Sequence, residues 1–439
     1  MKIVRGFADA EKLLMRSAGF VLPEVSPGLK TRLQELFGVD DPAVAVAQII
    51  AEVQKNGDAA LRDYAAKIDG IELTTIEVPA REVAASVNQI SPELLSYLKI
   101  AADRVRVFHE KQKEAFLTGM TRMAPGTVAR VLKRVGLYVP GGTASYPSSV
   151  LMTAIPARVA GVGEVIIATP PGKDGKVPAR TLAAAAIAGA DHIFAMGGAQ
   201  AIAALAHGTE SVPRVDKICG PGNLFVMLAK KQLYGVVDID GLQGPSEVVI
   251  IADDKANPVW VARDILAQAE HDVLAQSVLI TNSEALSQAV QKAVEDELPR
   301  QERRAIIEES LNSRGIIAVV ENLEEAFALS NQYAPEHLCL YIEESAKSVS
   351  RIDHAGCVFV GDHPTVIMGD YVAGPSHALP TSGTARFASP LNVTDFMRLM
   401  NVVEMDGALR RDLASVAAGI AKAEGLVAHA RAAMDDQED

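Results

Sequence analysis

Residues 164–198 read EVIIATPPGKDGKVPARTLAAAAIAGADHIFAMGG, and this stretch decides the expected fold. It begins with a short apolar run, EVIIATPP, continues with an alanine-rich helical pattern at 180–190, and returns to an apolar run, HIFAMGG. Short apolar strands that alternate with helices indicate a parallel sheet whose two faces are both covered. The stretch therefore predicts an α/β fold.

The alternation extends on both sides of this stretch. It begins near residue 148, and a second series of apolar runs follows: EVVIIADD, QSVLITN, GIIAVVE, LCLYIEE and CVFVGDH. We therefore expect two similar Rossmann-like α/β/α lobes with parallel sheets. Residues 1 to about 120 read as mainly helical, 127–140 as strand and turn, and 408–434 as one long amphipathic helix.

Composition narrows the classes of function. The 439 residues carry a formal charge of −13, from 42 basic and 55 acidic side chains, which argues against nucleic-acid binding and favours a small ligand. No apolar run reaches the roughly 18 residues that a membrane span needs, and no signal-peptide core is visible, so we expect a cytoplasmic protein without a membrane partner. The three cysteines predict buried, inert thiols rather than a disulfide framework.

The segment 361–393, GDHPTVIMGDYVAGPSHALPTSGTARFASPLNV, has neither a helical nor a strand period. Long segments of this kind are uncommon in compact domains and are usually functional or disordered. Because it is rich in apolar residues, we expect an ordered loop that directs His363, Asp370 and His377 toward a site.

Several polar side chains could bind a metal. Gln268 and His271 are three positions apart in an expected helix and would share one face, and Asp370 follows a glycine in the loop. His429 is five positions after Glu424, a rotation of roughly 140° that prevents the two from sharing a narrow helix face. Such nitrogen and oxygen ligands suit Zn²⁺ or another borderline divalent metal, although each residue taken alone is more often a polar group at a helix end or turn.

Two further features could carry chemistry. Glu336 and His337 stand at a helix-to-strand junction, where a Glu–His pair suits general acid–base catalysis or simply ends a helix. Glycine-rich turns follow three expected strands and could approach a phosphate or nucleotide, at Pro140-Gly141-Gly142, Gly197-Gly198 and 220–223. None matches the dinucleotide fingerprint, so the residues alone leave the cofactor open.

Taken together, seven motifs resemble the histidinol dehydrogenase family over nearly the whole chain. They are RVGLYVPGGTASYPSSVLMTAIPARVAGV (134–162), GGAQAIAALAHGTESVPRVDKICGPGN (197–223), GPSEVVIIAD (244–253), LAQAEHD (266–272), APEHL (334–338), GDYVAGPSHALPTSGTARFASPLNV (369–393) and AEGLVAHA (423–430). The resemblance implies a zinc-dependent, NAD-linked dehydrogenase that oxidises L-histidinol through the aldehyde to L-histidine, with two NAD⁺ consumed. This reaction closes histidine biosynthesis.

The resemblance also implies roles for single residues. One Zn²⁺ per subunit would be held by Gln268, His271, Asp370 and His429. Glu336 and His337 match the catalytic pair. NAD⁺ contacts match Tyr138, Gln200 and Asn223. Substrate contacts, in addition to the metal ligands, match Ser246, His337, His377 and Glu424.

The architecture implied is aldehyde-dehydrogenase-like and homodimeric, with active sites shared between subunits. We expect a helical region at 1–125 that contributes to the first lobe, an α/β lobe with the NAD motifs at 126–240, and a second lobe with the zinc and catalytic motifs at 241–380. The extension 381–439 would carry His429 and Glu424 to the partner subunit.

Two departures from the family pattern are Ser376, where many relatives have Asn, and Gly241-Leu242-Gln243, where others often have Met-Pro-Ala. The main alternative is a related zinc and NAD dehydrogenase of another small alcohol, such as a sulfonated diol. The Glu424…His429 pair and the GTARFASPL stretch favour histidinol. A non-catalytic metal- or nucleotide-binding protein on the same scaffold is the second alternative, and the Glu336–His337 pair speaks against it.

Overall fold

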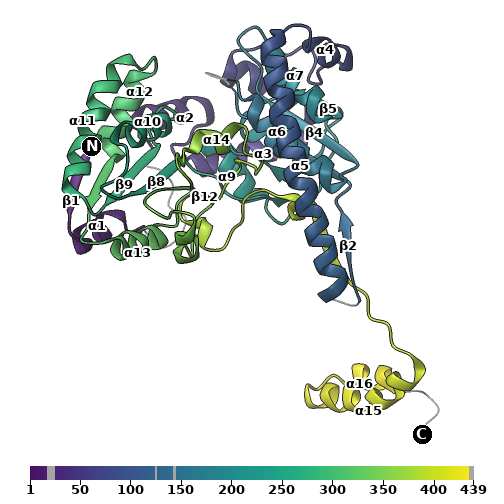
Figure 1. Cartoon of the computed structure of the whole chain (residues 1–439). Helices are drawn as coiled ribbons and strands as arrows, with labels where there is room; N and C mark the ends of the chain where they lie inside the picture. Colours follow the sequence, from purple (N-terminus) through teal and green to yellow (C-terminus); the bar gives the residue numbers. More distant parts are fainter. Residues whose placement is uncertain (17–24, 124–125, 142–144, 435–439) are drawn as a thin grey trace. The chain divides into compact units, whose positions relative to one another are not determined.

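The computed structural model describes residues 1–16, 25–123, 126–141 and 145–434 (Figure 1). The chain divides into two compact units, which we describe separately. Unit 1 comprises Met1–Ala115 and Val131–Met397, and unit 2 comprises Phe116–Arg130 and Arg398–Asp439. The boundaries expected from the sequence at residues 125, 240 and 380 stay predictions.

The first sheet of unit 1 has five parallel strands in the order β5-β4-β3-β6-β7. In chain order the strands are β3 (Arg134–Tyr138), β4 (Glu164–Thr169), β5 (His192–Ala195), β6 (Lys217–Cys219) and β7 (Asp238–Ile239). Side chains that alternate along β4 enter opposite cores, Val165 and Ile167 on one face and Ile166 and Ala168 on the other. Because both faces of β4 are buried, apolar residues occupy successive positions along it, which explains the continuous apolar run in the sequence.

Helices cover both faces of this sheet. The core on one face includes α5 (Pro92–Met123), α6 (Pro147–Ala160) and α7 (Ala179–Ala188). The core on the other includes α3 (Pro42–Tyr64), α8 (Gly198–His207) and α9 (Leu224–Leu233). The shorter helices α2 (Pro27–Phe37) and α4 (Ala80–Ser86) pack beside α3 and α7. The first lobe is therefore an α/β/α sandwich, as the sequence predicts.

The second sheet has six parallel strands in the order β1-β10-β9-β8-β11-β12. They are β1 (Lys2–Arg5), β8 (Glu247–Ala252), β9 (Gln276–Thr281), β10 (Ile316–Val319), β11 (His337–Tyr341) and β12 (Cys357–Phe359). One face is covered by α10 (Pro258–Ala269), α11 (Glu284–Glu297) and α12 (Arg304–Arg314), and the other by α1 (Phe7–Leu14) and α13 (Leu323–Tyr333) (Figure 1).

Strand order locates a candidate site in each sheet. The first sheet begins with β3, adds β4 and β5 on one side, and then adds β6 and β7 on the other. In the second sheet, apart from the edge strand β1, the series begins with β8, adds β9 and β10 on one side, and then adds β11 and β12 on the other. Ligands of open α/β sheets usually bind where the strand order reverses. In the first sheet this rule points to the carboxyl ends of β3 and β6; in the second sheet the Glu336–His337 pair lies instead at the amino ends of β8 and β11.

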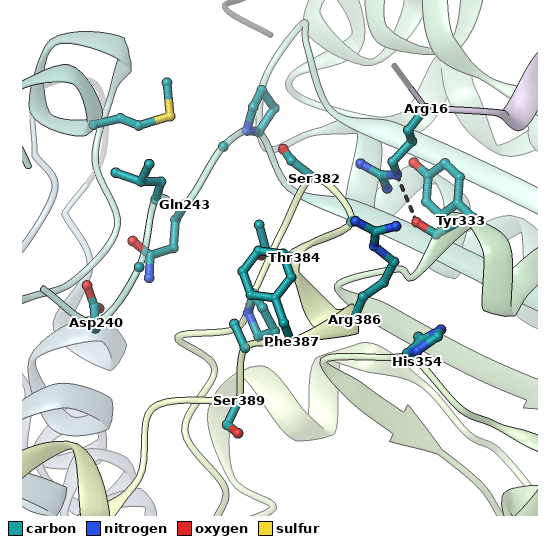
Figure 2. A pocket seen from close by; sticks show the side chains of 18 of the residues that line it. Arg16, Asp240, Gln243, Tyr333, His354, Ser382, Thr384, Arg386, Phe387 and Ser389 are labelled. Carbon is teal, nitrogen blue, oxygen red and sulfur yellow. Dashed lines mark hydrogen bonds between the residues drawn. The ribbon is translucent and has the colours of Figure 1, made fainter. Parts of the chain in front are cut away.

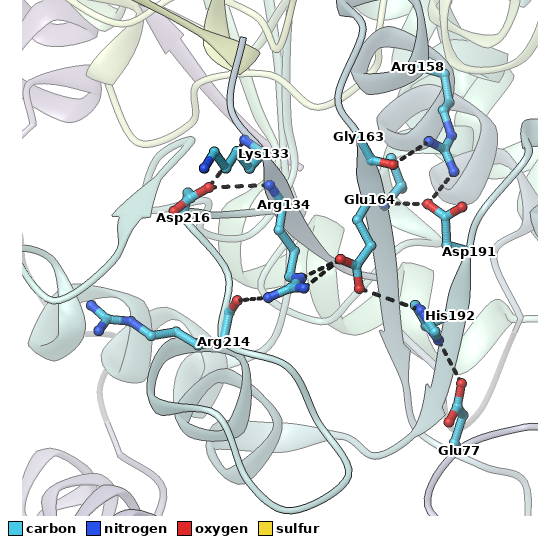
Figure 3. Close-up of polar contacts among 11 residues, drawn as sticks. Glu77, Lys133, Arg134, Arg158, Gly163, Glu164, Asp191, His192, Arg214 and Asp216 are labelled. Carbon is cyan, nitrogen blue, oxygen red and sulfur yellow. Dashed lines mark hydrogen bonds and ion pairs between the residues drawn. The ribbon is translucent and has the colours of Figure 1, made fainter.

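The amino-terminal edge of the first sheet is closed by ion pairs (Figure 3). Arg134 at the start of β3 lies 2.6 Å from Glu164 at the start of β4, and His192 at the start of β5 lies 3.4 Å from Glu164 and 2.7 Å from Glu77. Asp216 accepts from the backbone N–H of Arg134 at 3.2 Å. Because these polar groups pair with one another, we infer that the amino-terminal edge stabilises the sheet and that a ligand would bind at the carboxyl edge.

Unit 2 contains the strands β2 (Thr127–Val131) and β13 (Met397–Asn401), which pair with each other, and the helices α15 (Gly407–Ala423) and α16 (Val427–Ala433). The expected single helix over 408–434 is wrong, because Gly425 adopts φ 76° and separates α15 from α16. A left-handed glycine ends a helix at little steric cost. None of the described helices is long and apolar enough to cross a membrane.

Other local expectations also need correction. Residues 2–5, within the stretch expected to be mainly helical, form β1 and extend the second sheet. The expected strand and turn over 127–140 is two strands that belong to different sheets. The expected irregular loop 361–393 contains a six-residue helix, α14 (Val366–Tyr371), whose first turn is capped by the side chain of Thr365.

Candidate active site

The Glu336–His337 pair lies at the reversal point of the second sheet, at the amino ends of β8 and β11. The helix α13 ends at Tyr333, and Ala334 then adopts φ 52°, an uncommon conformation for a residue other than glycine. This turn leads directly into Glu336 and His337, whose side chains are both buried. Parallel pairing of β11 with β8 places His337 opposite Val248, beside Ser246 and Glu247.

Backbone groups of β8 hold both side chains of the pair. The N–H of Glu247 donates to Glu336 Oε2 at 2.8 Å, and His337 Nδ1 lies 3.1 Å from the carbonyl oxygen of Glu247. A carbonyl oxygen can only accept, so Nδ1 carries the proton in this contact. The second ring nitrogen, Nε2, is buried and makes no hydrogen bond within the described part of the chain.

Carboxylates surround the His337 ring. Nδ1 lies 3.4 Å from Glu336 Oε2 and Nε2 lies 3.4 Å from Asp370 Oδ1, distances of ion pairs rather than of aligned hydrogen bonds. Burial by itself disfavours the charged imidazolium, but Glu336 and Asp370 outweigh it and raise the pKa of His337 well above its usual value. The imidazolium is therefore the favoured form in this environment, and His337 can accept a proton only where the charge of a neighbouring carboxylate is offset.

Asp370 is carried by α14 and not by an irregular loop. A Cβ at Gly369 would lie 2.4 Å from the ring of Phe359, so the preceding glycine lets this helix approach β12 closely. Burial raises the pKa of Asp370, but neighbouring histidines outweigh that effect and lower it, His337 most strongly, followed by His377 and His271. Asp370 thus responds to the charge of three histidines, of which His337 lies 3.4 Å away.

Of the proposed metal ligands in unit 1, Gln268 is buried in α10 and its Nε2 has no partner among the described residues. The expectation that Gln268 and His271 share one helix face is wrong, because α10 ends at Ala269 and His271 lies in the following turn. Throughout the described ranges, no three His, Cys, Asp or Glu side chains lie close enough to hold a metal.

Two of the predicted site residues, Glu424 and His429, belong to unit 2. Glu424 caps the C-terminus of α15 and His429 lies in α16, and both are exposed. The rotation argued from one continuous helix does not apply to them, since Gly425 separates the two helices. Neither residue belongs to the unit that carries the catalytic pair.

The residues expected to contact NAD⁺ come from the carboxyl side of the first sheet. Tyr138 ends β3, Gln200 lies in the first turn of α8 after β5, and Asn223 caps α9 after β6. The hydroxyl of Tyr138 accepts from the N–H of Gly198 at 3.1 Å, and burial raises the pKa of this tyrosine to about 12. Asn223 is exposed and accepts from two N–H groups of the first turn of α9.

The glycine-rich turns pack tightly at this same edge. A Cβ at Gly141 or at Gly197 would lie 2.7 Å from Pro170, which follows β4, and a Cβ at Gly220 would lie 2.1 Å from the carbonyl oxygen of Tyr138. The expected role of Gly142 falls outside the described residues. Close packing of glycine turns at the β3/β6 junction is the arrangement by which α/β sheets bring backbone N–H groups to a phosphate.

Sequence reasoning missed the residues behind the catalytic pair. Glu247, Tyr333 and Arg16 form a buried cluster, and Arg16 and Tyr333 also line a cavity of about 1170 Å³ (Figure 2). Glu247 is the glutamate of the GPSE motif, so the sequence did contain a signal for it. No motif pointed to Arg16.

The two departures and the cysteines have structural explanations. Ser376 donates to the carbonyl oxygen of Met152, and Gln243 accepts from the ammonium group of Lys230. All three cysteines are free, with Cys219 and Cys339 buried and Cys357 half-buried. Burial raises the pKa of each, as the sequence predicts for inert thiols.

Comparison with known proteins identifies the relatives of this chain. The family model described as histidinol dehydrogenase matches residues 36–435. A histidinol dehydrogenase of Dehalococcoides mccartyi strain CBDB1 is 56% identical over 99% of both chains, and one of Deinococcus radiodurans is 44% identical over 98% of this chain and 99% of its own. The crystal structure of histidinol dehydrogenase from Elizabethkingia anophelis, 33% identical, covers 99% of this chain and 97% of its own with a TM-score of 0.86.

These matches confirm the resemblance and the α/β architecture expected from the motifs. The chain therefore belongs to the histidinol dehydrogenase family.

Proposed function

We propose that this protein oxidises L-histidinol through the aldehyde to L-histidine with two NAD⁺, the last step of histidine biosynthesis. The family supports this reaction, and the geometry of Glu336 and His337 is the observation that carries it. A buried imidazole is suited to repeated proton transfer when one nitrogen is fixed by a backbone carbonyl and the other, as here, makes no hydrogen bond within the described residues.

His337 would be the base in both oxidations. Its Nδ1 proton is directed at the carbonyl oxygen of Glu247, which leaves Nε2 to receive the alcohol proton as the C–H hydride leaves for the nicotinamide. Once water has added to the aldehyde and His337 has released its first proton to solvent, the hydrate loses a second proton to Nε2 and a second hydride to a second NAD⁺. Because the ring is buried, solvent cannot compete for Nε2.

Glu336 would activate the water that attacks the aldehyde. Its Oε2 accepts the N–H of Glu247, a contact that fixes the carboxylate beside His337. The neighbouring imidazolium formed in the first oxidation would then stabilise this charge at 3.4 Å. The two side chains thus have separate tasks in one pocket.

The donor set of Gln268, His271, Asp370 and His429 fits a divalent zinc ion. The amide oxygen of the buried Gln268 would be one ligand, since its Nε2 has no partner within the described residues that would fix the amide, and Asp370 is a half-buried carboxylate whose pKa the histidines lower despite burial. A bound Zn²⁺ would supply a template for the imidazole and amino nitrogens of histidinol. Ser246, His377 and Glu424 would add substrate contacts, as the family resemblance implies.

We assign the NAD⁺ contacts to Tyr138, Gln200 and Asn223 at the β3/β6 junction. When bound, the nicotinamide accepts a hydride in each oxidation. The close glycine packing at Gly220 and the helix N-termini of α8 and α9 support this assignment, since both favour a phosphate-bearing ligand.

A homodimer with shared active sites would bring His429 and Glu424 to the partner's pocket. The helix α15 supports this proposal, because it exposes apolar residues at helical spacing: Leu409, Leu413, Val416 and Ile420. An apolar stripe of this kind usually packs against another surface. We propose that a second copy of this chain covers it.

Steady-state NADH formation with L-histidinol, a sulfonated diol and simple primary alcohols tests the substrate. We expect histidinol to be preferred by orders of magnitude, and preference for the diol would support the alternative dehydrogenase. His337→Asn should lower kcat by about 10²–10⁴-fold with zinc content retained. Unchanged turnover would remove His337 as the base, and binding without any turnover would favour the non-catalytic alternative.

A further inference from the structure

Residue 247 contacts both members of the catalytic pair through its own peptide groups. Its N–H holds Glu336 Oε2 at 2.8 Å, and its carbonyl oxygen faces His337 Nδ1 at 3.1 Å. The orientation of one residue's backbone therefore sets the position of two catalytic side chains. That backbone is held in turn by the contacts of the Glu247 side chain.

The Glu247 carboxylate is buried, and three donors hold it. Arg16 Nη2 lies 2.7 Å from Oε2, the hydroxyl of Tyr333 donates to the same oxygen at 3.2 Å, and the N–H of Ser382 donates to Oε1 at 3.1 Å. A buried carboxylate is tolerated when it is paired and hydrogen-bonded on both oxygens. The donors come from the N-terminal segment, from α13 and from the segment after His377.

Arg16 also holds the turn that leads into the catalytic pair. Its Nε donates to the carbonyl oxygen of Tyr333 at 2.8 Å, and its guanidinium lies 3.8 Å from the centre of the Tyr333 ring. Figure 2 shows Arg16 and Tyr333 side by side, with Ser382 nearby. Tyr333 is the last residue of α13 and directly precedes Ala334, whose positive φ redirects the chain. One guanidinium therefore binds the start of β8 and the end of α13 together.

We propose that Arg16 and Glu247 form a positioning pair that holds Glu336 and His337 in their reactive geometry. The proposal rests on the roles of Glu336 and His337 given above. Arg16 fixes the Glu247 side chain and the Tyr333 carbonyl, and Glu247 transmits this restraint to the catalytic pair through its peptide groups. Within the described part of the chain, neither Arg16 nor the Glu247 carboxylate makes a hydrogen bond to the catalytic side chains, so they act through the backbone.

The geometry predicts a loss of rate rather than of binding. Displacing a catalytic group by about 1 Å can lower turnover about a hundredfold, since proton transfer needs hydrogen-bond contact. The residues assigned to zinc and NAD⁺ do not touch Arg16 or the Glu247 side chain in the described structure. Their affinity for metal and cofactor should therefore remain.

The experiment compares Arg16→Gln, Arg16→Lys and Tyr333→Phe in the full-length protein, with kcat expressed per bound zinc. We expect Arg16→Gln to lower kcat by about ten- to a hundredfold, with KM for histidinol and NAD⁺ within about twofold. Arg16→Lys should recover part of the loss because an ammonium can make one of the two contacts. Arg5→Ala, which removes an exposed ion pair between the end of β1 and Glu284 at the start of α11, is the matched control and should leave kcat unchanged.

A kcat of Arg16→Gln within twofold of wild type would overturn the proposal, as would equal losses in Arg16→Gln and Arg16→Lys. If Arg16→Gln does not fold, Tyr333→Phe decides, because it removes only one hydroxyl from Glu247 and should still lower kcat several-fold; an unchanged kcat would count against the pair. Failure of the proposed function has a different signature, since wild type itself would then not turn over histidinol.

Discussion

Replacing Lys230 by methionine should destabilise the first lobe and weaken NAD⁺ binding together. Lys230 lies on α9 with only 1% of its surface exposed, and its ammonium group donates to Asp240 at 2.6 Å, to Gln243 at 2.8 Å and to the carbonyl oxygen of Gly220 at 3.1 Å. Methionine has a similar shape but leaves the buried Asp240 carboxylate without its cation. The substitution also removes the hydrogen bond to the carbonyl oxygen of Gly220, in the turn that we assign to NAD⁺ binding.

The size of the effect follows from what remains around Asp240. Removing one partner of a buried ion pair costs about 3–5 kcal/mol of unfolding free energy. Asp240 keeps the N–H of Gly220 at 2.7 Å, so we expect a loss of about 3 kcal/mol, at the lower end of that range. At roughly 2–4 °C per kcal/mol for a domain of this size, the melting temperature should fall by about 10 °C.

Far-UV circular dichroism during heating, with KM for NAD⁺ measured alongside, checks this prediction. Lys292→Met is the matched control, because its pair with Asp296 is exposed and should contribute less than about 0.5 kcal/mol. The double variant Lys230→Met/Asp240→Asn should recover much of the stability, since it removes the unpaired charge. A fall of less than about 2 °C in Lys230→Met would refute the reasoning.

Three further predictions concern stability, cofactor and metal. Asp58 accepts hydrogen bonds from Ser211 and Thr209, which outweigh burial and lower its pKa. The stability that this carboxylate contributes should therefore be present above about pH 4 and fade as the pH falls further. Asp58→Asn should melt at a lower temperature than wild type at pH 7, and the two melting temperatures should converge near pH 3. Gly220→Ala should raise KM for NAD⁺ at least tenfold or prevent folding, because its φ is 113° and its Cβ would meet a backbone oxygen; unchanged kinetics would contradict the packing. Chelation should abolish turnover and leave circular dichroism unchanged, with added Zn²⁺ restoring activity; activity that survives complete metal removal would exclude zinc as the required ion.

Much of the fold was predictable because its signals are local. Strands such as 164–169 and 247–252 are continuous apolar runs between helical patterns, which is the signature of buried parallel strands. The errors arose where elements are short or where glycine intervenes. β1 has only four residues with charges at both ends, α14 has six and includes Gly369, and Gly425 separates two helices that read as one.

The candidate site was predictable only through the motif resemblance, and its residue roles stay predictions. Gln268, Asp370 and His337 are far apart in the chain, and no periodicity relates them. The contacts behind the catalytic pair were not predictable at all, since Arg16 and Glu247 are 231 positions apart. The homodimer, the zinc ion and the cytoplasmic location likewise stay predictions.

Counting NADH against a limiting amount of L-histidinol tests the central claim most directly. If His337 serves as the base in two successive oxidations, complete conversion should yield two NADH and one L-histidine for each histidinol supplied. One NADH per histidinol with release of the aldehyde would show that the second oxidation does not occur here. No NADH from histidinol would contradict the account.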